Sequence, residues 1–160
     1  MKQPALIAVM TLISLGVSAQ TPKISIKGID VGADKASVVA ITGTERSFVR
    51  GFTVAGINGD MALSYRDNRL DMAMYVFDPS YFITMKEAYA QKYTQLKCED
   101  SDVQNAMGAK FVQTICRYQD EEAALELTRY MDLRRSSLKI VSIEKLKRDA
   151  EANKEKQKDI

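Results

Sequence analysis

Hydrophobic and polar residues alternate along the middle of the chain, and this alternation predicts β-strands. Apolar or aromatic side chains recur at Met61, Leu63 and Tyr65, and the spacing resumes after a turn at residues 66–69. A period of two places successive side chains on opposite faces of a strand. The second run leaves open which face is buried, because Leu70, Met72, Met74 and Val76 alternate with Tyr75 and Phe77. We therefore predict an antiparallel meander, with a further reverse turn at Asn58-Gly59.

Three segments in the second half of the chain also have strand character. Residues 109–119 and 136–143 place β-branched and aromatic side chains between polar ones. The segment Ala123–Met131 suits a helix by its intrinsic propensities. We interpret it as a strand, because its apolar residues alternate and a short turn at Asp120-Glu121 would join it to the preceding strand.

The strongest helix signal begins at residue 78. Asp78 suits the N-cap, and Pro79 suits the first helical position, where its missing N–H has no helical partner. Phe82, Met85 and Tyr89 then recur at helical spacing, and Tyr93 continues the same stripe. Such a stripe indicates the face that a helix buries on a sheet, with a ligand groove as the alternative.

The segment that follows Lys23 predicts a short strand and then a short helix. Ile24 and Ile26 indicate the strand. Asp34 lies where a carboxylate stabilises the positive end of a helix over residues 35–41, and Gly43 is typical of a helix end.

These elements predict an α+β fold, in which an antiparallel meander sheet is packed by a short N-terminal helix and one longer central helix. We expect a single domain over residues 20–143. Residues 144–160 combine many acidic and basic side chains with a thin apolar stripe. We expect them to form a charged C-terminal helix or a disordered tail.

The first nineteen residues have the pattern of an export signal. Lys2 precedes an apolar run from Ala5 to Val17, and Val17-Ser18-Ala19 matches the small-x-small pattern at which signal peptidase cuts. The run is shorter than the roughly 20 apolar residues of a spanning helix. We therefore expect cleavage after Ala19, a periplasmic or secreted protein, and no stable membrane insertion after cleavage.

The chain has two cysteines, Cys98 and Cys116. An oxidising compartment favours a disulfide, and two cysteines permit one pairing. Their spacing matches neither the C-x-x-C redox motif nor a zinc pattern. We predict a structural disulfide that pins the end of the central helix to the sheet and contributes about 3 kcal/mol on the chain-entropy model.

Composition excludes several classes of function. The chain contains no histidine, which removes histidine general bases, Ser-His-Asp and Cys-His catalysis and the commonest metal ligand. The net charge of +2 lacks the basic excess of a nucleic-acid-binding protein. There is no phosphate-binding loop, dinucleotide fingerprint or EF-hand, and we interpret Glu99, Asp100 and Asp102 as a solvated loop. We expect no cofactor and no metal.

Two stretches resemble known proteins in layout. "IKGIDVGADKASVVAI" resembles the opening of small exported proteobacterial α+β domains, and "SYRDNRLDMAMYVFD" through "QNAMGAKFVQTICRY" resembles their body. The order of elements is also similar to the tandem halves of periplasmic β-lactamase inhibitor proteins and to small outer-membrane assembly lipoproteins, although the lipid-attachment cysteine of the latter is missing. The resemblance implies a fold and carries over no site residue.

The leading hypothesis is a non-enzymatic binding or inhibitory module that docks another envelope or secreted protein through the open face of its sheet. Tyrosine is enriched at interfaces, so Tyr65, Tyr75, Tyr118 and Tyr130 are the candidate interface residues; the alternative is that they complete the core.

Two alternatives remain. The first is a cell-wall glycan hydrolase built on a carboxylate pair, with Asp60, Asp67, Asp71 and Asp78 as candidates. The second is an envelope assembly factor that uses the charged C-terminal segment, Glu144–Ile160. The oligomeric state stays open.

Overall fold

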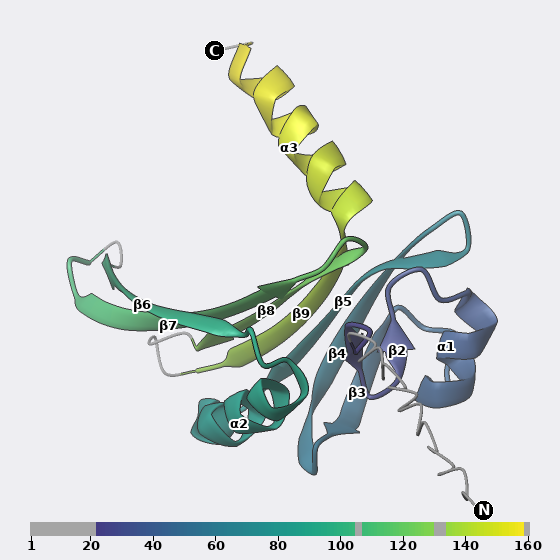
Figure 1. Cartoon of the computed structure of the whole chain (residues 1–160), viewed down its shortest axis with the longest axis horizontal. Coiled ribbons are helices and arrows are strands. Elements are labelled where there is room, and N and C mark those ends of the chain that lie inside the picture. Colours follow the sequence, from purple (N-terminus) through teal and green to yellow (C-terminus); the bar gives the residue numbers. More distant parts are fainter. Residues whose placement is uncertain (1–21, 105–106, 130–133, 159–160) are drawn as a thin grey trace, which may run out of the picture.

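The computed structural model describes residues 22–104, 107–129 and 134–158 and shows an α+β fold (Figure 1). The expected export signal and Tyr130 lie outside the described residues. The elements, in chain order, are β1 (Ser25–Ile26), β2 (Ile29–Asp30), α1 (Lys35–Thr42), β3 (Phe48–Val54), β4 (Ile57–Arg66), β5 (Arg69–Phe77), the 3₁₀ turn η1 (Pro79–Tyr81), α2 (Phe82–Lys92), β6 (Lys97–Gln104), β7 (Lys110–Gln119), β8 (Ala123–Arg129), β9 (Ser136–Ser142) and α3 (Ile143–Lys158).

Seven strands form one antiparallel sheet in the order β3-β4-β5-β9-β8-β7-β6. β3–β5 form one meander and β6–β9 form another, and the two join where β5 pairs with β9. β1 and β2 make a separate small hairpin. The expected α+β meander fold is therefore confirmed, and Ala123–Arg129 is a strand rather than a helix.

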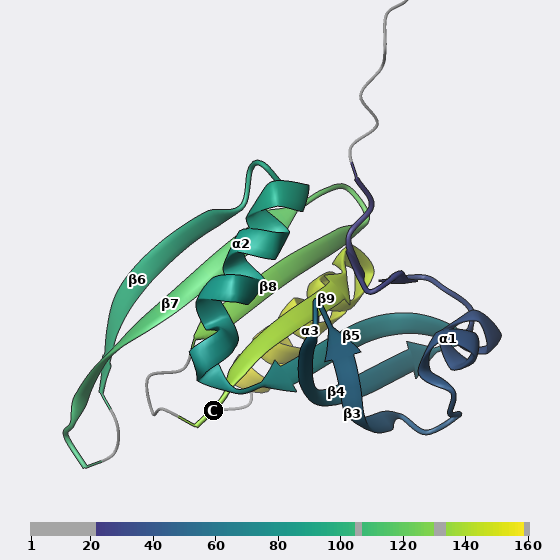
Figure 2. The same cartoon turned by 90° about the horizontal axis from the view of Figure 1, so that it is seen from below.

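One face of the sheet is covered by α1, α2 and the β1–β2 hairpin. Figure 2 shows α2 in front of the sheet and α3 behind it. Phe82, Met85 and Tyr89 of α2 are buried, and so are the side chains of β4, β5, β8 and β9 that point to the same side. The stripe predicted from helical spacing is thus the packing face of α2, and Tyr93 extends it.

Both helix starts follow the signals in the sequence. The side chain of Asp34 accepts a hydrogen bond from the N–H of Ser37 at 2.9 Å, and α1 ends at Gly43. The side chain of Asp78 accepts from the N–H of Ser80 at 2.8 Å, and Pro79 opens the 3₁₀ turn that leads into α2. Asp34 therefore lies at the start of α1 as expected, whereas Asp78 caps the 3₁₀ turn that precedes α2.

The reverse turn expected at Asn58-Gly59 is wrong. The chain turns at Ala55 and Gly56, whose φ angles are 49° and 78°, while Gly59 pairs with Phe77 inside the sheet. The glycine at position 59 serves packing, because a Cβ there would lie 2.7 Å from Cζ of Tyr75 and 2.3 Å from the carbonyl oxygen of Val76.

Cys98 and Cys116 form the expected disulfide, but the bond joins two strands instead of a helix and the sheet. They are direct partners in the register of β6 and β7. The segment containing Glu99, Asp100 and Asp102 is strand β6, and the solvated loop expected there is wrong. Sequence periodicity did not reveal this strand, because every side chain of β6 is exposed.

The charged C-terminal segment is a helix over its described part. Only the first turns of α3 contact the domain, where Arg148 pairs with Asp71 and the hydroxyl of Ser142 donates to the same carboxylate. Residues 149–157 are all exposed. Figure 1 shows α3 rising away from the sheet.

We expect Gly59→Ala to lower the free energy of unfolding by about 1–3 kcal/mol, because the added methyl overpacks the contact with Tyr75 and Val76. Urea denaturation measures the change. Ser64→Ala, on the same strand, is the matched control and should change stability by less than about 0.5 kcal/mol. Equal stability of wild type and Gly59→Ala would show that Tyr75 does not lie over this glycine.

Reduction of the disulfide should lower the free energy of unfolding by about 3 kcal/mol, because an 18-residue loop is opened. Urea denaturation with and without a thiol reductant tests this. A Cys98→Ala/Cys116→Ala chain should show no response to reductant. A wild-type transition that stays unchanged after complete reduction contradicts the expectation.

Candidate functional site

The face of the sheet opposite α2 has features of a binding site. Among the described elements, only the first turns of α3 approach it. Phe48 pairs with Ala62, and Ala62 with Met74, across three neighbouring strands. Val76 lies on the same side of β5 as Met74. We name Phe48, Ala62, Met74 and Val76 the open face.

Two grooves border the open face at the β3 edge. The first has a volume of about 540 Å³ and contains the four open-face residues together with Arg134 and Arg135. The second has a volume of about 900 Å³ and contains Phe48, Arg46 and Arg50. Phe48 is 49% exposed and belongs to both, and the guanidinium of Arg50 lies 6.0 Å from the centre of its ring. This surface is therefore apolar with a basic rim.

A row of charges crosses the same side of the sheet next to the open face. Glu126 of β8 accepts hydrogen bonds from Lys139 of β9 and from Arg117 of β7, each at 3.1 Å. Burial alone would raise the pKa of Glu126, but the two cations outweigh it and hold that pKa below its ordinary value. Since these charges compensate one another, the row is a stabilising feature of β7–β9.

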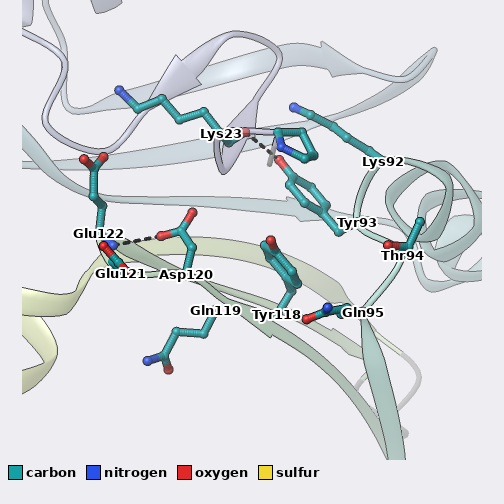
Figure 3. Close-up of a pocket in the computed structure, with 11 residues that line it drawn as sticks. Lys23, Lys92, Tyr93, Thr94, Gln95, Tyr118, Gln119, Asp120, Glu121 and Glu122 are labelled. Atoms are coloured by element: carbon teal, nitrogen blue, oxygen red, sulfur yellow. Dashed lines mark hydrogen bonds between the residues drawn. The ribbon is translucent and has the colours of Figure 1, made fainter. Parts of the chain in front are cut away.

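A polar cleft lies on the other side of the molecule, between the end of α2 and the β7–β8 turn (Figure 3). Its volume is about 980 Å³. The hydroxyl of Tyr93 donates to the carbonyl of Lys23 and accepts from the N–H of Ser25, both at 3.0 Å. The ring of Tyr118 stacks on Tyr93 with centroids 4.9 Å apart. These contacts fix the first described residues against α2.

The charged groups of this cleft are largely engaged in local structure. Lys92 donates to the hydroxyl of Ser25 at 2.7 Å, and Asp120 accepts from the N–H groups of Glu122 and Ala123 at 2.8 Å each. No group of metal-binding side chains is present in the part of the chain that the structure describes. The bonds of Lys92 and Asp120 hold the end of α2, the first described residues and the β7–β8 turn in place.

The predicted interface tyrosines do not lie on the open face. Tyr65, Tyr75 and Tyr118 all point to the side covered by α2. Tyr75 is fully buried, and its hydroxyl donates to the carbonyl of Ile57 at 2.6 Å. Tyr65 packs on the core, and Tyr118 lines the polar cleft. Tyr75 is a core residue, so its assignment to an interface is corrected.

The candidate carboxylates are separated into two pairs. Asp60 and Asp78 line the first groove beside the open face, and Asp67 and Asp71 line a groove at the base of α3. Hydrogen bonds from the side chain and backbone of Ser80 lower the pKa of Asp78. A lowered pKa keeps Asp78 ionised, whereas a general acid needs a raised one.

The residues that form the open face are not evident from the sequence alone. The alternation in β5 allowed either side to be buried, and tyrosine composition favoured the side that α2 covers. The signal that points to this face is the position of Met74 and Val76. These two residues alternate with the buried residues of β5 and therefore lie on its opposite side.

Comparisons with protein-family models, curated proteins and solved structures found no match to this chain. No helix among the described residues has the length and apolar character needed to cross a bilayer.

We expect Glu126→Gln to reduce the free energy of unfolding by about 0.5–1 kcal/mol at pH 7, since the charge pairs are partly exposed. The folded-state pKa lies below the ordinary value of 4.5. The stabilisation is therefore complete above that value and lost as the pH falls through the lower folded pKa. Denaturation across pH 2–7 should show the two proteins converging in acid. Glu121→Gln, in an exposed turn, is the control, and a difference that persists in acid contradicts the pairing.

Proposed function

We propose that this chain is an exported, non-enzymatic binding module that docks another envelope or secreted protein through its open face. The observation that carries the proposal is the arrangement of Phe48, Ala62, Met74 and Val76 on the uncovered side of the sheet, bordered by arginines. Apolar patches with a polar rim are typical of protein interfaces.

The unequal covering of the sheet supports this proposal. α2 buries its apolar stripe on one side, while Phe48 on the other side stays half exposed. Exposing an aromatic ring and two further apolar side chains in one row has a cost in solubility that a partner surface would remove. Arginine near an aromatic ring is also a common arrangement at sites of high binding energy.

Export is supported by the sequence of the first nineteen residues and by the disulfide. Disulfides persist in oxidising compartments and are rare in the cytosol. A disulfide at the base of the β6–β7 hairpin is consistent with a protein that works in the periplasm or outside the cell.

A second candidate function is that of an assembly factor acting through α3. The observation that favours it is that residues 149–157 form a helix with every side chain exposed. An isolated helix of this length is marginal in water, and a partner would stabilise it. A chain truncated after Arg148 keeps the contact with Asp71, so loss of a partner on truncation would support this function, and unchanged binding would exclude it.

We expect Phe48→Glu to weaken binding of the partner at least about tenfold, because it places a charge in the centre of the apolar surface. The measurement is affinity capture from periplasmic extract, with captured proteins quantified by mass spectrometry. Ile83→Glu is the matched control, since Ile83 is 51% exposed, lies on α2 and faces away from the open face. A protein held by wild type and Ile83→Glu but lost by Phe48→Glu is the expected result.

Two results contradict the proposal. Equal capture by Phe48→Glu and wild type would place the binding surface elsewhere. Capture lost equally in Phe48→Glu and Ile83→Glu would indicate a general effect of the added charge.

A further inference from the structure

The β6–β7 hairpin continues beyond the disulfide as a projecting arm, which we define as residues 99–104 and 107–115. Among the described residues, β8 pairs with β7 only from Thr114 to Gln119, so most of the arm is a two-stranded ribbon. Figures 1 and 2 both show this ribbon extending away from the body of the domain. Two-stranded ribbons are marginally stable alone in water.

The arm exposes apolar side chains. Val103 pairs directly with Phe111, and Val112 follows on the reverse side of the ribbon. Val103 is 38% exposed, Val112 is 43% exposed, and Met107 near the turn is 91% exposed. An exposed apolar group on a projecting element marks an interaction surface.

The arm and the open face have opposite charges. The arm contains three carboxylates and one lysine, a net charge of −2. The two grooves at the open face contain four arginines and two aspartates, a net charge of +2. Asp100 and Asp102 on the arm form no ion pair with other described residues, and neither do Arg46 and Arg135 at the grooves.

The arm of a molecule is far from the open face of that same molecule. β6 and β3 are opposite edges of the seven-stranded sheet. The six spacings between neighbouring strands, of about 4.8 Å each, place these two edges roughly 29 Å apart. The six residues of each arm strand reach about 20 Å outward, which is more than the width of β3–β5, at roughly 10 Å. The arm therefore fits the open face of another molecule in size, in apolar character and in charge.

We propose that the arm of one copy docks on the open face of a second copy, with Val112, the cross-strand partner of Asp102, against Phe48 and with Asp100 and Asp102 on the same side of the ribbon facing Arg46 and Arg50. The inference rests on the docking role proposed for the open face and differs from the proposed function in its occupant, which is a second copy of this chain. The contact joins two different surfaces, so it is heterologous. Such a contact propagates from one copy to the next unless the copies close into a ring. Screening of the opposed charges weakens it as the salt concentration rises.

The test is sedimentation velocity of the oxidised full domain, residues 20–160, between about 10 μM and about 1 mM. The arm variant is Asp100→Lys/Asp102→Lys, and the face variant is Arg46→Glu/Arg50→Glu. All four positions are exposed, so the fold is preserved. Glu87→Lys/Glu155→Lys is the control, with the same change in charge as the arm variant at sites remote from both surfaces.

Wild type and the control should associate with rising concentration, and each variant alone should associate at least about tenfold more weakly. An equal mixture of the two variants should recover association, because the reversed charges of one complement those of the other. A single chain with all four substitutions should recover it as well. Weakening by both variants distinguishes an arm-to-face contact from arm-to-arm and face-to-face contacts, in which one of the two variants would associate as strongly as wild type.

Three outcomes overturn the inference: wild type that stays monomeric through the whole range, an arm or face variant that associates as strongly as wild type, and a mixture that stays monomeric. If wild type is monomeric while Phe48→Glu still loses a captured partner, the proposed function stands and self-association alone fails. If wild type associates through the arm and Phe48→Glu leaves the capture of other proteins unchanged, the occupant is a second copy and the proposed foreign partner fails.

Discussion

The covering of one face of the sheet by helices and a hairpin is the constraint on which the rest of this structure depends. An antiparallel sheet needs a single covered face, and here α2 covers it through Phe82, Met85 and Tyr89, together with α1 and the β1–β2 hairpin. Tyr93 then holds the first described residues against the helix through the carbonyl of Lys23. Because the cover lies on one side, β4 and β5 divide their residues between a core and a surface. That division places Tyr75 inside and Met74 outside.

The sequence predicted the elements whose ends or periods have a direct physical cause. Asp78 and Pro79 mark the entry to α2, Gly43 ends α1, and the alternation in Ala123–Arg129 outweighs its helical propensity. The turn between β3 and β4 was misplaced because Asn-Gly is a common turn pair. The chain instead uses Ala55-Gly56 there and needs Gly59 for contact with a tyrosine ring.

The candidate site was less predictable, because it depends on which side of the sheet is covered. A period of two separates the faces of β5 but does not assign them to core or surface. Tyrosine content favoured the side that α2 buries, so the interface expected around Tyr75 and Tyr118 became core and cleft wall. β6 gave no periodic signal, since all its side chains are exposed. The arm is evident only from the structure, in which Cys98 pairs with Cys116 in the register of β6 and β7.

The disulfide, the arm and the open face are structurally related. The bond closes the hairpin at the point where the strands leave the domain, and the ribbon beyond it has apolar and acidic side chains but little packing of its own. The opposite edge of the sheet offers an apolar surface with a basic rim. α3 extends from the same side as that surface, and its exposed part is a further element available to a partner.

The methionines allow a direct test of the one-sided cover. Met61 of β4 and Met85 of α2 are fully buried on the covered side of the sheet, whereas Met72 and Met74 point to the other side of the sheet and are partly exposed. NMR of ¹³C-labelled methionine methyl groups with a soluble paramagnetic agent measures their contact with solvent. The account predicts broadening of the Met72 and Met74 signals, while those of Met61 and Met85 stay sharp. Equal protection of all four methyl groups in a monomeric sample would contradict it, because both faces of the sheet would then be covered.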